Sequence, residues 1–405
     1  MNRVARYVIA ALAVLVSLHY LLSFTHEGYG KATSLSGIKK TFLPPKASTQ
    51  DDLDALYKSG HLPNATLSVQ SKANATFVIL CRNNDLSSIV SSVREIEDRF
   101  NRNHGYPYVF LNEEPFTDEF KKRLSVLTAA PMEFGVIPHD HWFQPDSIDE
   151  EKARAGREKM VKNNIIYGGS VSYRNMCRFN SGFFFRHPLM LKYRWYWRIE
   201  PGVHFHCNLN QDPFMYMEQN NKTYGKLMAT APNPHPSLTS SHQGFTITMY
   251  EYEATIPTMW GHVKEFMKRH PEYIAEDNAF GFMSPDGDKY NLCHFWSNFE
   301  IADMDFWRGP AYTAFFEYLD SQGGFYYERW GDAPVHSIAA AIFLNRHQIH
   351  FFDEIGYEHN PYTHCPKLGD NWVNGRCSCD QKRSFDYDGY SCMSKWDKFM
   401  GLPSS

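Results

Sequence analysis

The sequence predicts an α/β protein whose central sheet is mixed but mainly parallel and is flanked by helices. Three short runs of strand-forming residues alternate with helical patterns between residues 76 and 137, an order typical of parallel sheets. A further strand-like run ends at Glu200. With 43% apolar and 16% aromatic residues in the chain, the roughly 330 residues after position 75 can bury one large core. We therefore expect a single elaborated domain at residues 76–405.

The alternation begins with an expected strand at residues 76–82, TFVILCR. The apolar residues that follow have the spacing of one helix face: Leu86, Ile89, Val90, Val93, Ile96 and Phe100. A second strand is expected at residues 108–115, a helix at 117–127 and a third strand at 133–137. This right-handed βαβ beginning suits a nucleotide-binding half.

No glycine-rich phosphate loop follows the first expected strand. Arg82-Asn83-Asn84-Asp85 stands where a dinucleotide-binding fold has its glycines, which argues against a Rossmann cofactor. The planar donor fork of Arg82 suits a nucleotide base or phosphate. The alternative is an arginine that pairs with Asp85 or caps the loop.

The N-terminal 75 residues differ from the rest. Residues 7–24 form an almost uninterrupted apolar run behind Arg3 and Arg6, and their length of about 18 residues is near the lower limit for spanning a bilayer. The positive-inside rule then predicts a signal anchor, with residues 1–6 in the cytosol and the rest of the chain in the lumen. A cleaved signal peptide is the alternative, because Ser23 and nearby small residues suit a peptidase. Residues 25–75 lack periodicity and predict a lumenal stem.

Charge and cysteine content narrow the class of protein further. The formal net charge is -4 and no basic stripe interleaves with aromatic residues, so we expect no nucleic-acid partner. Eight cysteines include the C-terminal group Cys365, Cys377, Cys379 and Cys392. In a lumenal compartment this group predicts disulfides. A zinc site fits its spacing poorly.

Several acidic and basic residues in the middle of the chain are candidates for binding a metal ion or a phosphate. Glu200 ends a strand-like run at a Pro-Gly break that leads into HFHC, a position where a hard oxygen ligand can meet a divalent ion and a diphosphate. The alternative is a solvated turn residue. Within residues 171–187, Tyr173 and Arg178 lie among aromatic residues. These two residues either bind a phosphate or flank an aromatic core. A helix near residues 257–269 carries no evident chemistry.

The C-terminal third has further candidates. Residues 290–300, YNLCHFWSNFE, have the aromatic and amide composition of a sugar subsite or of a buried strand. Asp332 precedes a helical pattern and is a plausible N-cap. A strand is expected at residues 349–353, followed by a loop at residues 356–361. His359 in that loop is either a metal ligand or a hydrogen-bonded surface histidine.

Five segments together resemble the fungal Golgi α-1,2-mannosyltransferases of glycosyltransferase family 15: YRNMCRFNSGFFF, YWRIEPGVHFHC, YNLCHFWSNFEIA, GGFYYERWGDAPVHSIAAA and GYEHNPYTHCP. The resemblance spans residues 76–392. It implies a GT-A glycosyltransferase fold, a single-pass type II protein of the Golgi membrane, GDP-mannose as donor and Mn²⁺ as cofactor. It also implies transfer, with retention, to the 2-hydroxyl of a terminal mannose on N- or O-linked glycans of glycoproteins.

The resemblance also assigns roles to residues. Glu200 and His359 are similar to the family's metal ligands, and Tyr173 resembles a tyrosine that contacts the diphosphate. Arg82 and Arg178 are further candidates for donor nucleotide contacts.

Two acids resemble residues of the reaction centre. Glu300 resembles a candidate nucleophile, which either forms a glycosyl-enzyme or steadies an oxocarbenium-like centre during front-side attack. Asp332 resembles an acid near the reacting sugar. Asn208 departs from the family, because relatives often carry an aspartate there. We expect activity to persist, since the metal ligands are Glu200 and His359.

Two other functions are weighed against the transferase. A catalytically idle, lectin-like partner of a glycosyltransferase complex would keep the aromatic residues and lose the metal ligands. A glycoside hydrolase could use Glu300 and Asp332 as a carboxylate pair, but it would leave Glu200 and His359 unexplained.

Overall fold

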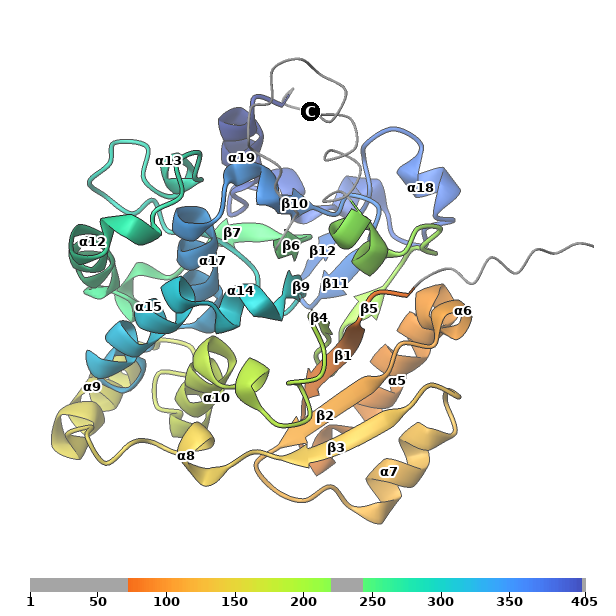
Figure 1. Ribbon diagram of the computed structural model, residues 1–405, viewed down its shortest axis with the longest axis horizontal. Helices are drawn as coiled ribbons and strands as arrows, with labels where there is room; N and C mark the ends of the chain where they lie inside the picture. The colour runs from red at the N-terminus through yellow and green to blue at the C-terminus, as the bar shows by residue number, and fades with distance from the viewer. Residues whose placement is uncertain (1–71, 220–242, 403–405) are drawn as a thin grey trace, which may run out of the picture. The chain divides into compact units, whose positions relative to one another are not determined.

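A seven-stranded mixed sheet forms the centre of the structure, a computed structural model that describes residues 72–219 and 243–402. Its strand order is β10-β6-β9-β4-β1-β2-β3 (Figure 1). The strands are β1 Ala75–Leu80, β2 Tyr108–Asn112, β3 Met132–Val136, β4 Trp195–Arg198, β6 Gln243–Phe245, β9 Glu300–Asp303 and β10 Ile349–Phe351. The expected α/β class and its mainly parallel central sheet are confirmed.

Strand β9 is antiparallel to both of its neighbours, whereas the other pairings of this sheet are parallel. β1 pairs in parallel with β2 and β4, β2 with β3, and β10 with β6. β9 pairs in antiparallel fashion with β4 and β6. In the β4–β9 register, Arg198 lies opposite Glu300. The reversed strand therefore starts where β4 ends, at the edge of the sheet where ligands of α/β proteins bind.

Helices cover both faces of the sheet. The α-helices are α5 Leu86–Ile96, α6 Arg102–His104, α7 Asp118–Ser125, α8 His139–Trp142, α9 Glu150–Lys162, α10 Val171–Gly182, α12 Met259–Arg269, α13 Phe280–Met283, α14 Met304–Arg308, α15 Pro310–Ser321, α16 Gly324–Tyr327, α17 Asp332–Phe343, α18 Asn371–Asn374 and α19 Met393–Met400. A π-helical stretch, Glu97–Asn101, joins α5 to α6. The expected strand–helix order up to β3 is confirmed, and so is the helix near residues 257–269.

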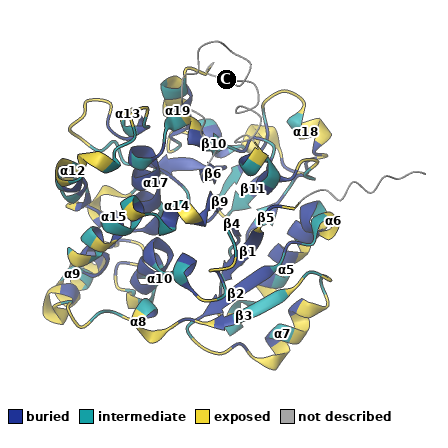
Figure 2. Cartoon of the chain, viewed as in Figure 1, coloured by how far each residue is buried: buried dark blue, intermediate teal, exposed yellow. Residues whose placement is uncertain are grey.

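Alternating residues of β4 divide the core into two layers. Trp195 and Trp197 pack in one cluster with α5 and α7, whereas Tyr196 packs in another with α10, α15 and α17. Their alternation follows from the two-residue period of a strand. Figure 2 shows the strands and the inner faces of these helices as buried, with exposed residues on the outer faces of α7 and α9. A strand buried on both faces explains why residues 195–197 carry bulky aromatic side chains on each side.

Two smaller sheets lie beside the central one. The first has the order β12-β11-β5, from β5 His204–Phe205, β11 Tyr357–His359 and β12 Tyr362–His364. The second is the antiparallel pair of β7 Thr248–Tyr250 and β8 Cys293–Phe295. The expected loop at residues 356–361 is therefore wrong for residues 357–359, because Tyr357 pairs with Phe205 and His364 on either side. Buried Tyr357 favours this pairing over a loop.

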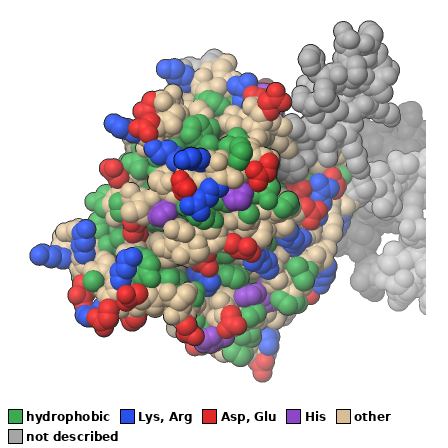
Figure 3. Space-filling view, turned by 60° about the vertical axis from the view of Figure 1, so that its left-hand side comes forward, with side chains coloured by type: hydrophobic (Ala, Val, Ile, Leu, Met, Phe, Trp, Pro, Cys, Tyr) green, Lys and Arg blue, Asp and Glu red, His purple; other side chains and the backbone are tan. Residues whose placement is uncertain are grey.

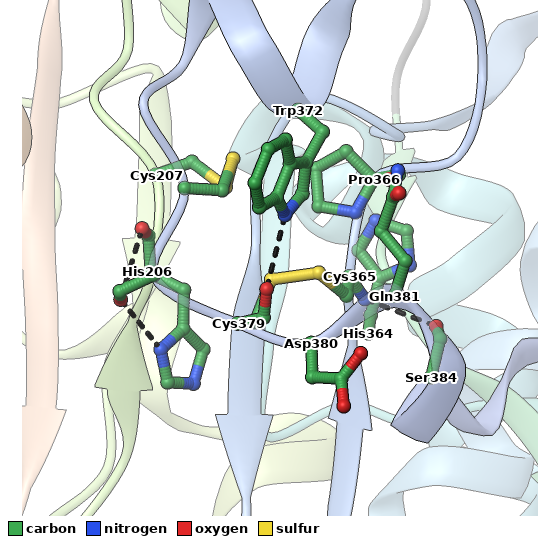
Figure 4. The surroundings of a disulfide bond; sticks show 12 residues. His206, Cys207, His364, Cys365, Pro366, Trp372, Cys379, Asp380, Gln381 and Ser384 are labelled. Atoms are coloured by element: carbon green, nitrogen blue, oxygen red, sulfur yellow. Dashed lines mark hydrogen bonds between the residues drawn. A yellow bond between two sulfur atoms is a disulfide. The ribbon is translucent and has the colours of Figure 1, made fainter.

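Three disulfides fasten the C-terminal segment: Cys207–Cys377, Cys293–Cys392 and Cys365–Cys379. The predicted disulfide role of the C-terminal cysteines is thus confirmed, and two of these bonds reach back to distant cysteines. Cys365–Cys379 closes a loop against Trp372, whose indole N–H donates to the carbonyl oxygen of Cys379 at 3.0 Å (Figure 4). The cysteines at 81 and 177 are free and buried.

No helix among residues 72–219 and 243–402 is long and apolar enough to cross a membrane, and the predicted span at residues 7–24 lies outside these described residues.

On the face drawn in Figure 3, acidic and basic side chains are interspersed with hydrophobic ones, so that face presents no stripe of a single charge.

The disulfides are expected to stabilise the fold by an amount that grows slowly, with the logarithm of the length of the loop that each closes. Cys293–Cys392 spans 99 residues and Cys365–Cys379 spans 14. Replacing the first pair by serine should lower the free energy of unfolding by about 4 to 5 kcal/mol, and the second by about 3 kcal/mol. Urea unfolding of the two double variants measures both losses. A larger loss from the short loop would contradict this account.

A buried histidine predicts a pH dependence of stability. His364 is fully buried, with Nδ1 at 3.0 Å from Asp386 and Nε2 at 3.0 Å from the carbonyl oxygen of Asp353. Burial alone would lower the pKa of His364, but the Asp386 carboxylate outweighs burial and raises it above its ordinary value. A raised folded-state pKa stabilises the protein below the unfolded-state pKa of about 6.5, and this contribution is lost as the pH rises through the folded-state pKa.

We therefore expect His364→Gln to cost more unfolding free energy at pH 6 than at pH 8.5. Urea unfolding at both pH values measures this difference. The matched control is His139→Gln, since the side chain of His139 is 78% exposed. An equal cost of His364→Gln at both pH values would contradict the assigned ion pair.

Candidate active site

A cavity of about 410 Å³ opens beyond the carboxyl ends of β1 and β4. It is lined by Leu80, Cys81, Arg82, Asp85, Glu113, Trp142, Tyr167, Ser170, Ser172, Tyr173, Met176, Arg198, Glu200 and Pro201. Three of the residues predicted from the sequence, Arg82, Tyr173 and Glu200, are thus brought together. Another cavity, of about 480 Å³, lies between α6 and the loop before β3 and holds none of the predicted residues. We treat the first cavity as the candidate site.

Arg198, the last residue of β4, links the acids beside this cavity. Its Nη1 donates to Oδ2 of Asp332 at 2.5 Å, and its Nη2 donates to Glu200. The side chain is buried, which by itself would lower the pKa of Arg198. The carboxylates of Asp332 and Glu200 outweigh burial and raise that pKa above its ordinary value. Arg198 is therefore a permanent buried cation held by two acids.

Asp332 does not occupy the N-cap position that the sequence predicts for it. Asp332 is the first residue of α17. The cap position is occupied by Gly331, which has no side chain that could cap the helix. The Asp332 carboxylate instead accepts from Arg198 and from the hydroxyl of Ser297, the latter at 2.7 Å. The prediction of an N-cap is wrong because a buried cation and a hydroxyl compete successfully for this carboxylate.

Glu200 lines the cavity and contacts His359, which is itself absent from the cavity lining. Glu200 follows β4 by two residues, and Gly202, two residues further on, has a φ of +84°, which turns the chain toward β5. Oε2 of Glu200 lies 3.4 Å from Nε2 of His359, the last residue of β11. Burial alone would raise the pKa of Glu200, but Arg198 and His359 outweigh it and lower that pKa to about 2.

These two side chains fit a divalent transition metal. A carboxylate oxygen and an imidazole nitrogen face each other, and both side chains are partly exposed, by 24% for Glu200 and 31% for His359. Such oxygen and nitrogen donors suit Mn²⁺. Within residues 72–219 and 243–402, no group of three or more His, Cys, Asp or Glu side chains forms a metal site. The protein thus offers two donors, and other ligands would complete the coordination.

Glu300, the first residue of β9, is only 2% exposed. The hydroxyl of Tyr196 and the amide of Gln243 donate to its carboxylate, the latter at 2.7 Å, and Nδ1 of His336 lies at 3.0 Å. Glu300 and Arg198 line a small second cavity next to the first. Sequence reasoning missed Arg198 and these three partners of Glu300. The only available signal was an arginine in the strand-like run just before Glu200.

Tyr173 and Arg82 both line the candidate site. The ring of Tyr173 stacks on Tyr167, with centroids 4.5 Å apart, and the guanidinium carbon of Arg329 lies 5.2 Å from the centroid of the Tyr173 ring. Burial raises the pKa of Tyr173 well above its ordinary value. The Arg82 side chain bonds Glu113 at 2.9 Å and Ser172, while Asp85 accepts its backbone N–H at 2.7 Å.

Two predicted residues lie apart from this group. Arg178 forms a bidentate ion pair with Asp320, at 2.8 and 2.9 Å, and is absent from the cavity lining. Its predicted contact with the nucleotide has no support in this geometry. Asn208 accepts a hydrogen bond from Arg99 at 2.9 Å, and it too is absent from the lining.

The segment at residues 290–300 is largely buried, as expected of a buried strand, and its sugar-subsite role stays a prediction. Phe295 and Phe299 are buried in the core, as for a buried strand. Trp296 is half-buried, and its ring centroid lies 4.9 Å from that of His359. Trp296 is therefore positioned beside the candidate metal ligand.

Comparisons with known proteins agree with this geometry. The chain is 49% identical over 362 residues to Alpha-1,2 mannosyltransferase KTR1 of Saccharomyces cerevisiae, covering 89% of this chain and 86% of that protein. It is 50% identical over 332 residues to Glycolipid 2-alpha-mannosyltransferase 2 of Candida albicans, covering 82% and 68% of the two chains.

Solved structures show the same fold. The mannosyltransferase Ktr4p from S. cerevisiae in complex with GDP matches with a TM-score of 0.73 and 40% identity, over 81% of this chain and 82% of that one. Core-mannan synthase A from Aspergillus fumigatus, in its Mn/GDP form, matches with a TM-score of 0.73 and 37% identity, over 84% and 88%. The GT-A fold predicted from the resemblance is thereby confirmed.

A family model described as Glycolipid 2-alpha-mannosyltransferase matches residues 37–233 and 237–401 of this chain. The fold, the cavity at the end of β4 and these matches lead to one conclusion: the chain belongs to the glycolipid 2-alpha-mannosyltransferase family, glycosyltransferase family 15.

Proposed function

We propose that this chain is a retaining α-1,2-mannosyltransferase. It transfers mannose from GDP-mannose to the 2-hydroxyl of a terminal mannose on N- or O-linked glycans, and it depends on Mn²⁺. The observation that carries the proposal is the 3.4 Å contact of His359 with Glu200, a carboxylate that lines the 410 Å³ cavity. The GDP of the Ktr4p structure and the Mn/GDP form of core-mannan synthase A support the choice of donor and metal.

Glu200 and His359 would hold Mn²⁺, with phosphate oxygens and water as the remaining ligands. When bound, the ion neutralises negative charge on the departing diphosphate. The low pKa of Glu200, about 2, keeps this carboxylate ionised at neutral pH. Arg198 holds Glu200 in place from the protein side.

Tyr173 and Arg82 would contact the donor. Because burial raises the pKa of Tyr173, its phenol keeps its proton and can donate a hydrogen bond to the leaving group. The exposed guanidinium of Arg82, held by Glu113, can turn its remaining donors toward phosphate or base.

Glu300 and Asp332 would act on the sugar in different ways. Both oxygens of Glu300 already accept hydrogen bonds inside the core, which supports electrostatic stabilisation of a cationic sugar over nucleophilic attack. Arg198 and Ser297 both donate to Oδ2 of Asp332, and no donor among the described residues bonds its Oδ1. That oxygen is available to a sugar hydroxyl.

The organisation of the chain follows from the same proposal. Residues 1–6 form a cytosolic tail, 7–24 a signal anchor in the Golgi membrane, 25–75 a lumenal stem and 76–405 the catalytic domain. The apolar run behind Arg3 and Arg6 supports the type II orientation, and the three disulfides suit an oxidising lumen.

Product formation tests the proposal. The full-length chain, purified in detergent, is incubated with GDP-mannose, methyl α-mannoside and Mn²⁺. We expect a disaccharide that an α-1,2-specific mannosidase digests, and that is lost with a chelator and restored by Mn²⁺. Binding of GDP and acceptor without any product would instead favour the idle lectin-like partner. Hydrolysis of mannosides without a nucleotide would favour the hydrolase.

Replacing Glu200 by alanine should lower Mn²⁺-dependent transfer by at least about 100-fold, because it removes one of the two protein donors. Initial rates and Mn²⁺ binding by electron paramagnetic resonance measure the loss.

The matched control is Glu358→Ala. Glu358 precedes His359 on β11, but its carboxylate bonds His206 at 2.9 Å. We expect its rate to change less than about threefold, as for an ion pair near the surface. Unaltered Mn²⁺ binding in Glu200→Ala would refute the metal assignment.

Replacing Glu300 by glutamine should lower kcat about 100-fold and leave the KM for GDP-mannose nearly unchanged, because the amide removes charge near the sugar while keeping the side chain's size. Steady-state kinetics measures both constants. Rescue of Glu300→Ala by azide, with formation of mannosyl azide, would indicate a nucleophile and contradict the electrostatic role.

A further inference from the structure

The carboxylate of Glu300 is surrounded by donors from three separate elements. The hydroxyl of Tyr196 on β4 donates to Oε2, and the amide of Gln243 on β6 donates to Oε1 at 2.7 Å. Nδ1 of His336 on α17 lies 3.0 Å from Oε2 and 3.2 Å from Oε1. Of these three donors, only His336 lies within hydrogen-bond distance of both oxygens. Because the last torsion of a glutamate side chain is otherwise broad, this contact restricts the rotation of the carboxylate.

The direction of the hydrogen bond from His336 follows from the chemistry of its partner. The electrostatic role proposed for Glu300 requires an ionised carboxylate, which only accepts hydrogen bonds. Nδ1 of His336 must then carry the proton and donate it. The side chains of His336 and Glu300 are 1% and 2% exposed, so water does not compete for this contact. A hydrogen bond to a charged acceptor in such a dry environment is strong.

The other ring nitrogen of His336 shows that packing alone does not explain this residue. Nε2 is buried and has no hydrogen-bond partner within residues 72–219 and 243–402. An unsatisfied buried nitrogen costs free energy, and an apolar side chain of similar size would pack there without that cost. The histidine is accounted for if its contribution is the hydrogen bond from Nδ1 to Glu300.

Trp307 on α14 supports two of the three donors. Its indole N–H donates to the hydroxyl oxygen of Tyr196 at 3.0 Å. Because that oxygen accepts from Trp307, the single hydroxyl proton of Tyr196 is directed to Glu300. The indole ring of Trp307 also stacks on the imidazole of His336, with centroids 4.3 Å apart and planes 21° from parallel. Trp307 therefore orients one donor by a hydrogen bond and the other by ring stacking.

His336 and Trp307 lie behind Glu300 rather than in a cavity. Neither residue lines the 410 Å³ cavity or the small second cavity beside it, whereas Glu300 lines the second. A substrate in these cavities would therefore not touch His336 or Trp307. Any influence of these two residues on the reaction must pass through Glu300.

We propose that His336, held by Trp307, is a positioning residue of the transfer reaction. It keeps the Glu300 carboxylate in the orientation in which its charge faces the cationic sugar. This proposal rests on the proposed function and on the electrostatic role of Glu300 within it. It assigns His336 an effect on turnover rather than on donor binding, because the positive charge on the sugar develops in the transition state.

The test uses the full-length chain with GDP-mannose, methyl α-mannoside and Mn²⁺. His336→Leu removes the donor, and we expect kcat to fall at least about tenfold, since a misplaced reacting group costs a rate factor of this order or more. The KM for GDP-mannose should stay within about twofold. His336→Asn puts an amide nitrogen near the position of Nδ1, and it should keep kcat within about threefold of the unmodified chain.

A double variant separates positioning from a purely structural role. If His336 acts only through Glu300, then adding His336→Leu to Glu300→Gln should lower kcat by less than about twofold, because the charge to be oriented is already absent. A structural role would lower kcat by the same factor in both backgrounds.

His364→Leu is the matched control. His364 is also fully buried with Nδ1 at 3.0 Å from a carboxylate, that of Asp386, but this pair lies outside the proposed reaction centre. We expect His364→Leu to lower the melting temperature and to keep kcat within about twofold. All rates are measured at a temperature at which thermal melting shows each variant to be folded. If His336→Leu does not fold, His336→Gln replaces it, because its longer side chain carries the amide away from the position of Nδ1.

The outcomes separate the two proposals. An unchanged kcat in folded His336→Leu overturns the positioning role and leaves the proposed function intact. Equal factors in the two Glu300 backgrounds, or a loss in His336→Asn as large as that in His336→Leu, do the same. Failure of the unmodified chain to transfer mannose overturns the proposed function, and the positioning role with it.

Discussion

A buried arginine holds the proposed reaction centre together. Arg198 is 8% exposed, and its guanidinium bonds Asp332 at the start of α17 and Glu200 just after β4. A buried cation costs several kcal/mol unless its donors are satisfied, so these contacts are obligatory for the fold. They also bring together two acids that lie 132 positions apart in numbering, at 200 and 332. Glu300, opposite Arg198 in the β4–β9 register, adds a third carboxylate beside the same cation.

The reversed strand and the C-terminal disulfides place the remaining groups. Because β9 runs antiparallel to β4, its first residue, Glu300, lies opposite Arg198, the last residue of β4. Both residues therefore lie at the same edge of the sheet. His359 arrives from far along the chain because β11 pairs with β5, which follows Glu200 closely. The Cys207–Cys377 bond ties the residues after β5 to the C-terminal segment. A site assembled from such distant segments needs this support, since its geometry must already exist when substrates bind.

The sequence predicted elements with strong local signals. Short runs of strand-forming residues between helical patterns predicted β1 to β3, and the cysteine group indicated disulfides. Motif resemblance indicated Glu200 and His359, which the structure brings within 3.4 Å. Predictions from local sequence failed at residues whose structure is determined by partners far away in the chain. Asp332 looked like a helix cap because its partners, Arg198 and Ser297, lie elsewhere in the chain. Residues 357–359 looked like a loop because their strand partner is β5. The nucleotide contact of Arg178 stays a prediction, and nothing nearby in sequence revealed its ion pair with Asp320.

The stereochemistry of the product tests the central claim most directly. Arg198, Glu300 and the proposed metal pair are interpreted as one arrangement for retaining transfer of mannose, and retention is visible in a single linkage. Nuclear magnetic resonance of the disaccharide formed from GDP-mannose and methyl α-mannoside reports its anomeric configuration and linkage position. The account predicts an α-anomer joined to the 2-hydroxyl. A β-anomer, or a bond to any other hydroxyl, would contradict it.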